Sequence, residues 1–268
     1  MELKMAVVGK DVSKSLSPKM HKFILGKLGY SCTYDKVSLD MEEFDTKFPL
    51  LLKEYDTLNV TIPYKLDCMK YLEIKDDAKI FNAVNTIKCD TLCGYNTDGM
   101  GFMLMLENAS IEVNNKKVLV LGSGGVGRSV IKKLIDAKAI VFAYDLNQAN
   151  LAAVANEFSG FTPLDKIDIL PYDIIINCTG VGMHKTEGKS PVGEDLISLA
   201  SNLVDLIYEP EESEFLRLGR INGKKTLNGK AMLFYQAYYA DCYFLNLKKD
   251  SKLALNLYLE YEKIDAKA

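Results

Sequence analysis

A glycine-rich turn in the middle of the chain has the residue types and spacing needed to bind a dinucleotide. Gly122, Gly124 and Gly127 in "LGSGGVG" have G-x-G-x-x-G spacing and follow the apolar run 118–121 directly. One glycine permits the tight turn, another lets the backbone approach a pyrophosphate, and the third lets helix and strand pack closely. Unpaired N–H groups at the start of the helix then face the phosphate charge. We expect this turn, Gly125 included, to bind a dinucleotide; the alternative is a glycine-rich turn with a purely structural role.

An acidic residue ends the next predicted strand. Asp145 in "AIVFAYDLNQ" lies 23 positions after Gly122. A carboxylate at this place accepts hydrogen bonds from an adenosine ribose and repels a 2′-phosphate. Leu146 and Asn147 follow it, so no arginine is at hand for such a phosphate. These residues favour NAD over NADP; the alternative is that Asp145 only caps the next helix.

Polar side chains also gather in "LNVTIPYK", residues 58–65. The alternation of apolar and polar residues predicts a short strand with one buried face, and the strand should stop at Pro63, which cannot donate to a sheet. Asn59, Thr61 and Lys65 would then stand where a buried strand ends. The apolar members of the alternation are Leu58, Val60 and Ile62.

The first hundred residues alternate short apolar runs with helical patterns, which predicts a small α/β domain with a mostly parallel sheet. Strands are expected at 4–9, 32–39, 58–62, 83–89 and 91–96, and helices at 17–29, at 40–53 and just after Pro63. The segment 101–110 reads as a helix that leads out of this domain.

The second half predicts a dinucleotide-binding, Rossmann-type domain. Residues 114–145 read as strand, glycine turn, helix and strand, and further strands are expected at 172–180, 202–208 and 224–229, with a helix at 213–222. This half is complete before the helical stretches near 230–246 and 250–263, so we expect these helices to pack back on the first domain. The predicted domains, facing a cleft, are 1–100 plus 232–268 for the substrate and catalysis, and 101–231 for the dinucleotide.

Composition excludes several classes of function. The 268 residues carry a formal net charge of −3, and the lysines are scattered among acids, so no nucleic-acid partner is expected. No run approaches the length of a membrane span, and no signal peptide is expected. Six dispersed cysteines and only two histidines make a metal site improbable and point to a reduced, cytoplasmic protein.

Eight motifs together resemble the shikimate dehydrogenase family, which includes quinate/shikimate dehydrogenases. They are "SLSPKMH", "NVTIPYK", "AVNTI", "GYNTDG", "GSGGVG", "NCTGVGM", "DLIY" and "GKAMLFYQA", in the family's order and at about its spacing. The resemblance covers essentially the whole chain, and "NVTIPYK" and "NTDG" are its most specific parts. It implies reversible reduction of 3-dehydroshikimate to shikimate, on the route to chorismate and aromatic amino acids, with a nicotinamide cofactor that is usually NADPH.

The resemblance also implies roles for individual residues. Lys65 and Asp98 match the catalytic pair: an ammonium stabilises the charge that builds on the ketone oxygen or supplies the proton, and the carboxylate positions it. The alternative is an ordinary surface ion pair. Substrate-binding positions are matched by Ser15, Ser17, Asn59, Thr61, Asn85, Tyr208 and Gln236. Positions near the dinucleotide are matched by Thr179, Met183 and Gly229, in addition to the glycine turn and Asp145.

Several of these residues have a plain structural alternative. Ser17, just before Pro18, is a natural helix cap, Asn59 and Asn85 could satisfy strand ends, and Gln236 could be exposed. Met183 could be core filler rather than a wall of the nicotinamide pocket.

Two stretches depart from the family pattern. Asp145-Leu146-Asn147 replaces the Asn-Arg-Thr whose arginine grips a 2′-phosphate, which resembles the NAD-using branch, some members of which oxidise quinate. Lys230 and Ala231 replace the Leu and the second Gly of Gly-Leu-Gly-Met-Leu; alanine takes little room, so activity should survive.

Other functions stay open. They are a quinate-preferring enzyme, a non-catalytic sensor of dinucleotide or hydroxy acid, and a two-domain enzyme acting on one-carbon folates. Retention of Lys65 with Asp98 argues against the sensor, and the serines with "NTDG" argue against the folate enzyme. The expected ligand is a small molecule, and the expected assembly a monomer or homodimer.

Overall fold

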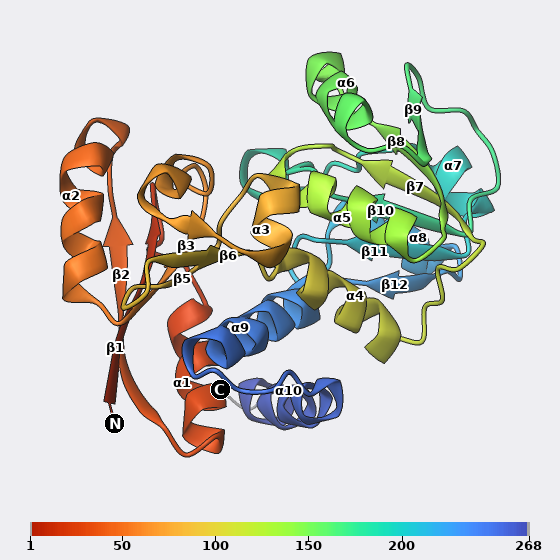
Figure 1. The fold of residues 1–268 in the computed structure, drawn as a ribbon. Coiled ribbons are helices and arrows are strands. Elements are labelled where there is room, and N and C mark those ends of the chain that lie inside the picture. The colour runs from red at the N-terminus through yellow and green to blue at the C-terminus, as the bar shows by residue number, and fades with distance from the viewer. Residues whose placement is uncertain (1, 267–268) are drawn as a thin grey trace. The chain divides into compact units, whose positions relative to one another are not determined.

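The computed structural model describes residues 2–266 and divides into two compact units (Figure 1). The first unit comprises Met1–Gly101 and Phe234–Ala268, and the second comprises Phe102–Leu233. The chain passes from one unit to the other within two helices, α4 (Asp98–Asn108) and α9 (Lys230–Phe244). The predicted α/β class, with a Rossmann-type second domain, is confirmed.

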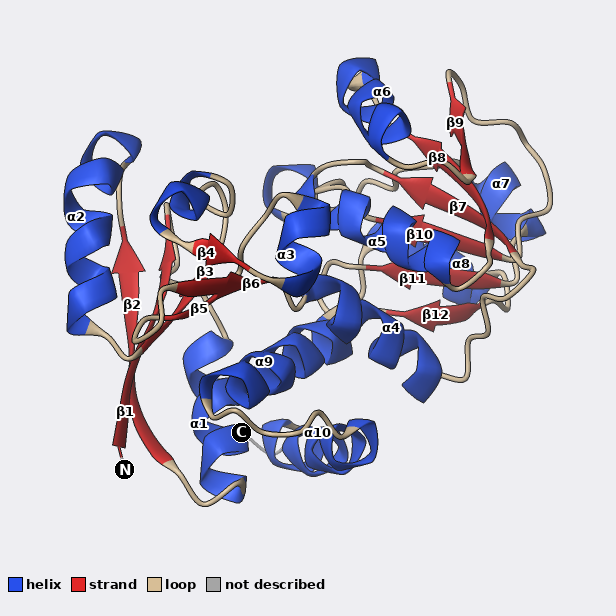
Figure 2. Ribbon diagram, in the orientation of Figure 1, coloured by secondary structure: helices blue, strands red, loops and turns tan. Residues whose placement is uncertain are grey.

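The first unit is built on a mixed six-stranded sheet of order β2-β1-β3-β5-β6-β4 (Figure 2). β1 pairs in parallel with β2 and β3, whereas β5 runs antiparallel to both β3 and β6. The strands are β1 (Glu2–Gly9), β2 (Ser31–Ser38), β3 (Thr57–Val60), β4 (Glu73–Ile74), β5 (Thr86–Lys88) and β6 (Cys93–Tyr95). The helices are α1 (Ser17–Lys27), α2 (Met41–Glu54), α3 (Asp76–Phe81), part of α9, α10 (Ser251–Asp265) and the 3₁₀ turn η1 (Asp67–Tyr71).

Side-chain alternation along β1 divides the core of the first unit into two faces. Ala6 and Val8 pack with Phe44 and Phe48 of α2, whereas Met5 packs with Phe244 of α9. A strand buried on both faces reads as a continuous apolar run, as "MAVV" does. The C-terminal helices pack back on the first domain as predicted.

The strand that begins "LNVTIPYK" is shorter than predicted. β3 ends at Val60, and the Thr61 N–H still donates to the Val8 carbonyl at 2.9 Å before the chain leaves the sheet. The alternation therefore stops, and Ile62 is 74% exposed rather than buried as the pattern predicted. A cis peptide bond links Ile62 to Pro63.

The second unit has a six-stranded parallel sheet of order β12-β11-β10-β7-β8-β9. This is the doubly wound strand order of a dinucleotide-binding fold. Successive strands are added on one side of β7 up to β9 and then on the other side from β10, and ligands bind at this switch point between β7 and β10. The strands are β7 (Lys117–Leu121), β8 (Ile140–Tyr144), β9 (Phe161–Leu164), β10 (Ile174–Asn177), β11 (Asn202–Asp205) and β12 (Lys225–Leu227). The helices are α5 (Gly125–Asp136), α6 (Gln148–Glu157), α7 (Glu194–Leu199), α8 (Glu214–Ile221) and the 3₁₀ turn η2 (His184–Thr186), together with the later part of α4.

Among residues 2–266, no helix combines the length and the apolar character that crossing a membrane requires.

Candidate active site

Lys65 and Asp98 meet in the first unit as a partly buried ion pair. Lys65 Nζ lies 2.7 Å from Asp98 Oδ2, and the two side chains are 18% and 4% exposed. The Lys65 carbonyl accepts the Val84 N–H at 2.7 Å, which anchors the loop after β3. Asn96 Oδ1 accepts the Asp98 N–H at 3.0 Å, which fixes the start of α4. Thirty-three positions separate the two residues in sequence, so tertiary structure alone brings them together.

Asn85 connects this pair to α9. Its Nδ2 donates to Asp98 Oδ1 at 2.9 Å and to Gln236 Oε1 of α9 at 3.3 Å. Its Oδ1 accepts the Thr97 N–H at 3.0 Å. Both oxygens of Asp98 are therefore partnered, one by an ammonium and one by an amide. A mere surface ion pair would have neither this burial nor this second layer of hydrogen bonds.

Asn59 extends the same polar cluster along β3. Its Nδ2 donates to the Asn85 carbonyl at 3.3 Å, and its Oδ1 accepts the Tyr34 hydroxyl at 2.7 Å. Thr61 follows at the end of the strand, where a Cβ on Gly9 would lie 2.5 Å from Thr61 Cγ2, so the two segments are in close contact. Four of the residues matched to substrate binding, Asn59, Thr61, Asn85 and Gln236, thus join the Lys65 pair or flank it.

The two serines lie at the start of α1. Ser15 Oγ accepts the Ser17 N–H at 3.3 Å, and Ser17 is the first helical residue. Leu16 occupies the N-cap position, and no side chain caps this helix, so the reading of Ser17 as a cap is wrong. Neither hydroxyl therefore caps α1, although Ser15 Oγ accepts one N–H within the loop.

The glycines in the turn of the second unit differ in their backbone conformation and in the space around them. Gly122 has a φ of +92°, which a side chain would strain, and a Cβ on Gly127 would lie 2.1 Å from the Gly122 carbonyl oxygen. A Cβ on Gly124 or Gly125 would meet no heavy atom within 4 Å. The turn itself therefore requires glycine at 122 and 127, whereas Gly124 and Gly125 leave open space beside the first N–H groups of α5. No side chain caps α5, so these donors suit an anion.

Asp145 is tied to the glycine turn. Its Oδ2 accepts the N–H of Ser123 at 2.6 Å and the Ser123 hydroxyl at 2.8 Å, and its Oδ1 accepts the Asn147 N–H at 2.8 Å. Burial acts to raise the pKa of Asp145, but these hydrogen bonds outweigh it and lower the pKa, so the group is an anion at neutral pH. Asn147 is the N-cap of α6, so Asp145 is not merely a cap. Leu146 is 85% exposed beside it.

A buried amide and a buried carboxylate organise the loops after β10 and β11. Asn177 Oδ1 accepts the Thr179 N–H at 3.0 Å, and Asn177 Nδ2 donates to the Val181 carbonyl and to Asp205 Oδ1, each at 3.0 Å. Asp205 Oδ1 also accepts the Ile207 N–H at 3.0 Å. Burial raises the pKa of Asp205 to about 6 against hydrogen bonds from Ser213, Ile207 and Asn177.

These loops carry the remaining matched residues of the second unit. Thr179 and Met183 follow β10, and Tyr208, half-buried with its pKa raised by burial, follows β11. A Cβ on Gly229 would lie 2.1 Å from the Leu206 carbonyl oxygen, so that glycine lets two backbones touch.

Reasoning from residue types overlooks five polar side chains that hold these sites together. Asn96, Thr97, Asn177 and Asp205 lie inside the motifs "GYNTDG", "NCTGVGM" and "DLIY", which is the available signal. Tyr34 lies in no motif, and nothing in its sequence context indicates its contact with Asn59.

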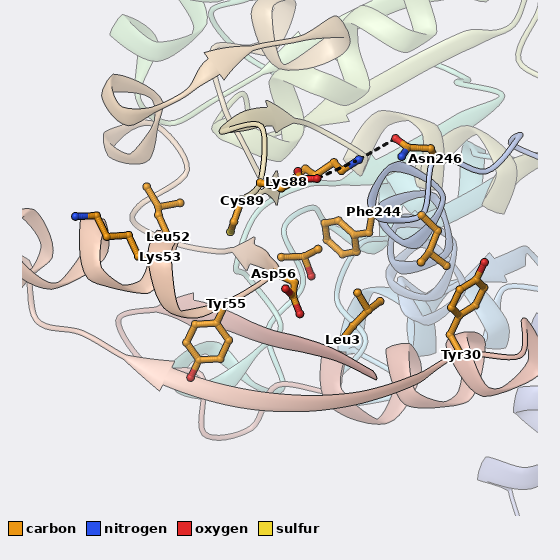
Figure 3. A pocket seen from close by; sticks show the side chains of 13 residues that line it. Leu3, Tyr30, Leu52, Lys53, Tyr55, Asp56, Lys88, Cys89, Phe244 and Asn246 are labelled. Carbon is orange, nitrogen blue, oxygen red and sulfur yellow. Dashed lines mark hydrogen bonds and ion pairs between the residues drawn. The ribbon is translucent and has the colours of Figure 1, made fainter. Parts of the chain in front are cut away.

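A separate hollow in the first unit carries no comparable chemistry. It has a volume of about 610 Å³ and includes Thr57, at the opposite end of β3 from Thr61 and Lys65. Figure 3 shows the Lys88 amine directed at Asn246, whose Oδ1 it meets at 3.0 Å. The other charged residues that line it are Lys53, Asp56 and Asp90. Within residues 2–266, no group of three or more His, Cys, Asp or Glu side chains could hold a metal ion.

Comparison with known proteins gives a consistent result. A family model described as the shikimate dehydrogenase substrate binding domain matches residues 7–87. A shikimate dehydrogenase (NADP(+)) of Clostridium beijerinckii is 36% identical over 96% of this chain and 97% of its own length, and one of Carboxydothermus hydrogenoformans is 34% identical over 87% and 88%.

Solved structures agree. A chorismate mutase/shikimate 5-dehydrogenase fusion protein from Clostridium acetobutylicum superposes with a TM-score of 0.88 at 33% identity, over 99% of both chains. The shikimate 5-dehydrogenase of Thermus thermophilus, solved in complex with NADP(H) and shikimate, superposes with a TM-score of 0.83 at 29% identity, over 95% of this chain and 98% of that one.

Proposed function

The chain belongs to the shikimate dehydrogenase family, and from that premise we propose that it catalyses the reversible, nicotinamide-dependent reduction of 3-dehydroshikimate to shikimate. The observation that carries the proposal is the polar cluster of the first unit, in which Lys65, Asp98, Asn85 and Gln236 converge from four separate segments.

The proposed chemistry uses Lys65 as the proton donor. When the dinucleotide is bound, its nicotinamide supplies a hydride to the ring ketone carbon. The electron pair of the C=O π bond moves to the oxygen, and the Lys65 ammonium stabilises that charge and gives it a proton. In the direction of oxidation, neutral Lys65 takes the hydroxyl proton. Asp98 holds the ammonium in place through the 2.7 Å contact, and Asn85 holds the second oxygen of Asp98.

The substrate is a small acid with several hydroxyls, which needs a polar cage because a buried unpaired hydroxyl costs about 1–3 kcal/mol. We assign the ring carboxylate to Ser15 and Ser17. The ring hydroxyls are assigned to Asn59, Thr61, Asn85 and Gln236, and Tyr208 is assigned to the border of the substrate.

The second unit fits a dinucleotide. The open space at Gly124 and Gly125 and the uncapped N-terminus of α5 would receive the pyrophosphate. Thr179, Met183 and Gly229 are assigned to the nicotinamide end, and Asp145 to the adenosine ribose.

We propose that NAD is the preferred dinucleotide of this chain, although its relatives are named for NADP(+). Asp145 is an anion held in place by Ser123 and Asn147, and the exposed neighbour, Leu146, brings no positive charge. A 2′-phosphate would therefore meet repulsion from Asp145 that neither Leu146 nor Asn147 compensates.

Initial rates test the proposal: oxidation of shikimate and of quinate, each with NAD and with NADP at matched concentrations, followed by nicotinamide absorbance. We expect fast shikimate oxidation with NAD leading. Faster turnover with NADP would leave the proposed activity standing and refute the role assigned to Asp145. Faster turnover of quinate would make quinate, not shikimate, the preferred substrate. If none of the four assays shows oxidation while a dinucleotide still binds, a non-catalytic sensor would be favoured.

A further inference from the structure

Tyr34 lies at the centre of a buried aromatic and charged group in the first unit. It sits on β2, 6% exposed, and its ring stacks on that of His21 of α1 with centroids 5.1 Å apart. His21 Nδ1 in turn lies 2.6 Å from Asp241 Oδ1 of α9, and both side chains are almost wholly buried. His21 of α1, itself fixed by Asp241 of the distant helix α9, therefore holds the Tyr34 ring in place.

The same surroundings determine the charge state of the Tyr34 phenol. Burial raises the pKa of Tyr34 well above its usual value, the nearby Asp241 carboxylate adds to the effect, and the Ser17 hydroxyl opposes it. The phenol is therefore neutral at physiological pH and keeps its O–H. It lies close to two residues assigned to the substrate, Ser17 and Asn59.

The contact with Asn59 distinguishes the two ends of that amide. The oxygen and nitrogen ends of an asparagine amide have nearly the same shape, and only their partners decide which way it faces. The Tyr34 hydroxyl donates to Oδ1 at 2.7 Å, while Nδ2 donates one N–H to the Asn85 carbonyl at 3.3 Å. A flipped amide would set two acceptors, Asn59 Oδ1 and the Asn85 carbonyl, against each other, and would take from the Tyr34 hydroxyl the acceptor to which it now donates. The second N–H of Nδ2 is then the part of Asn59 that a ligand can use.

We propose that Tyr34 is a positioning residue that fixes the orientation of the Asn59 amide, so that Asn59 presents an N–H donor to a ring oxygen of the substrate. The inference rests on the proposed function, since it deepens the role assigned to Asn59. Tyr34 acts through Asn59 and takes no part in proton transfer, so its loss weakens substrate binding and leaves the dinucleotide site alone.

The decisive variant is Tyr34→Phe, which removes the hydroxyl and keeps the ring on His21. We expect KM for shikimate to rise about fivefold to tenfold, as for the loss of one buried hydrogen bond, with kcat and KM for the dinucleotide within about twofold. In an Asn59→Ala background, adding Tyr34→Phe should change KM by less than about 1.5-fold, because the residue through which Tyr34 acts is already gone.

Two further variants separate positioning from a general loss of structure. Tyr55→Phe is the matched control, because the Tyr55 hydroxyl also donates to a side chain of the first unit, Asp35 Oδ2 at 2.9 Å, without contacting Asn59. Its KM should stay unchanged. Asn59→Asp keeps an acceptor for Tyr34 but has no N–H, so its KM should rise at least as much as that of Asn59→Ala.

The outcomes decide between the inference and the proposed function. An unchanged KM in Tyr34→Phe, additive losses in the double variant, an equal loss in Tyr55→Phe, or wild-type affinity in Asn59→Asp would each overturn the role of Tyr34. A wild-type protein that oxidises nothing would instead contradict the proposed function. Shikimate binding measured by calorimetry on the same variants would then still report on Tyr34.

Discussion

The two units position their polar groups by different means. In the first unit, side chains hold other side chains: Asp98 is fixed by Lys65 and Asn85, and Asn59 by Tyr34. In the second unit the backbone does most of the positioning, through close contacts at Gly122 and Gly127, with Asn177 and Asp205 pinning two loops.

This difference sets what a substitution does in each unit. Removing one side chain from the first unit should remove chemistry or substrate affinity and leave the fold intact. Adding one to the second unit should displace the backbone, unless the glycine faces open space. Substitutions in both units test that contrast, from the largest expected effect to the smallest.

Lys65→Ala should lower kcat by about a thousandfold, because it removes the proton donor and the charge opposite the ketone oxygen. Dinucleotide affinity, measured by calorimetry, should stay within about twofold, since the groups assigned to it lie in the second unit. Equal losses in turnover and dinucleotide affinity would contradict the assignment.

Lys88→Ala is the matched control for that variant. Its side chain is 14% exposed, against 18% for Lys65, and its amine likewise bonds a side chain of the first unit, Asn246. Turnover should be unchanged. A loss of turnover comparable to that of Lys65→Ala would show that removing any partly buried lysine of the first unit lowers activity, so that the position of Lys65 beside Asp98 is not the cause.

Gly127→Ala and Gly124→Ala should separate folding from binding in the second unit. A Cβ on Gly127 would overlap the Gly122 carbonyl, so we expect the melting temperature to fall by about 5 °C or more. A Cβ on Gly124 meets nothing within 4 Å, so that variant should melt within about 1 °C of wild type and bind dinucleotide at least about tenfold more weakly. Equal melting temperatures in the two variants would refute the division of roles.

Asp205→Asn should flatten the dependence of stability on pH. Because burial raises the folded-state pKa of Asp205 from 3.8 to about 6, the folded protein binds this proton more tightly than the unfolded chain does. The resulting stability is full below pH 3.8 and is lost as pH rises through about 6, an effect of about 3 kcal/mol. Melting temperatures recorded from about pH 4 to pH 7 should therefore fall less steeply in the variant than in wild type; parallel curves would contradict the shift.

Asp145→Asn should reduce the preference for NAD over NADP about tenfold in kcat/KM, since it removes one negative charge near the 2′ position. Ser123→Ala is the control, because it removes a hydrogen bond to Asp145 and keeps the charge. If both variants shift the preference equally, the charge of Asp145 does not decide it.

Much of the architecture could be predicted from local pattern. The apolar strand before "GSGGVG", the helix after it and the acid after the next strand are each set by neighbours in sequence. Short elements escape such reasoning: α6 and β9 lie on the edge of the sheet, where few apolar residues are buried and periodicity is weak. The pattern also misplaces Ile62, because the strand ends two residues earlier than the alternation indicates.

The site was less predictable where it depends on contacts between distant segments. Lys65 and Asp98 could be paired only through a family resemblance, because nothing local links residues 33 positions apart. Tyr34, His21 and Asp241 belong to three separate elements, and each alone has the composition of ordinary core. Such side chains become visible only when the fold places their partners beside them.

The central claim is tested most directly by following the hydride itself. The protein would be given 3-dehydroshikimate with nicotinamide dinucleotide carrying deuterium at the transferable position, as NADH and as NADPH in separate reactions, and the product would be analysed by mass spectrometry. The account predicts shikimate with a single deuterium on the ring carbon that bore the ketone, formed faster from NADH. Unlabelled 3-dehydroshikimate recovered unchanged from both reactions would contradict it.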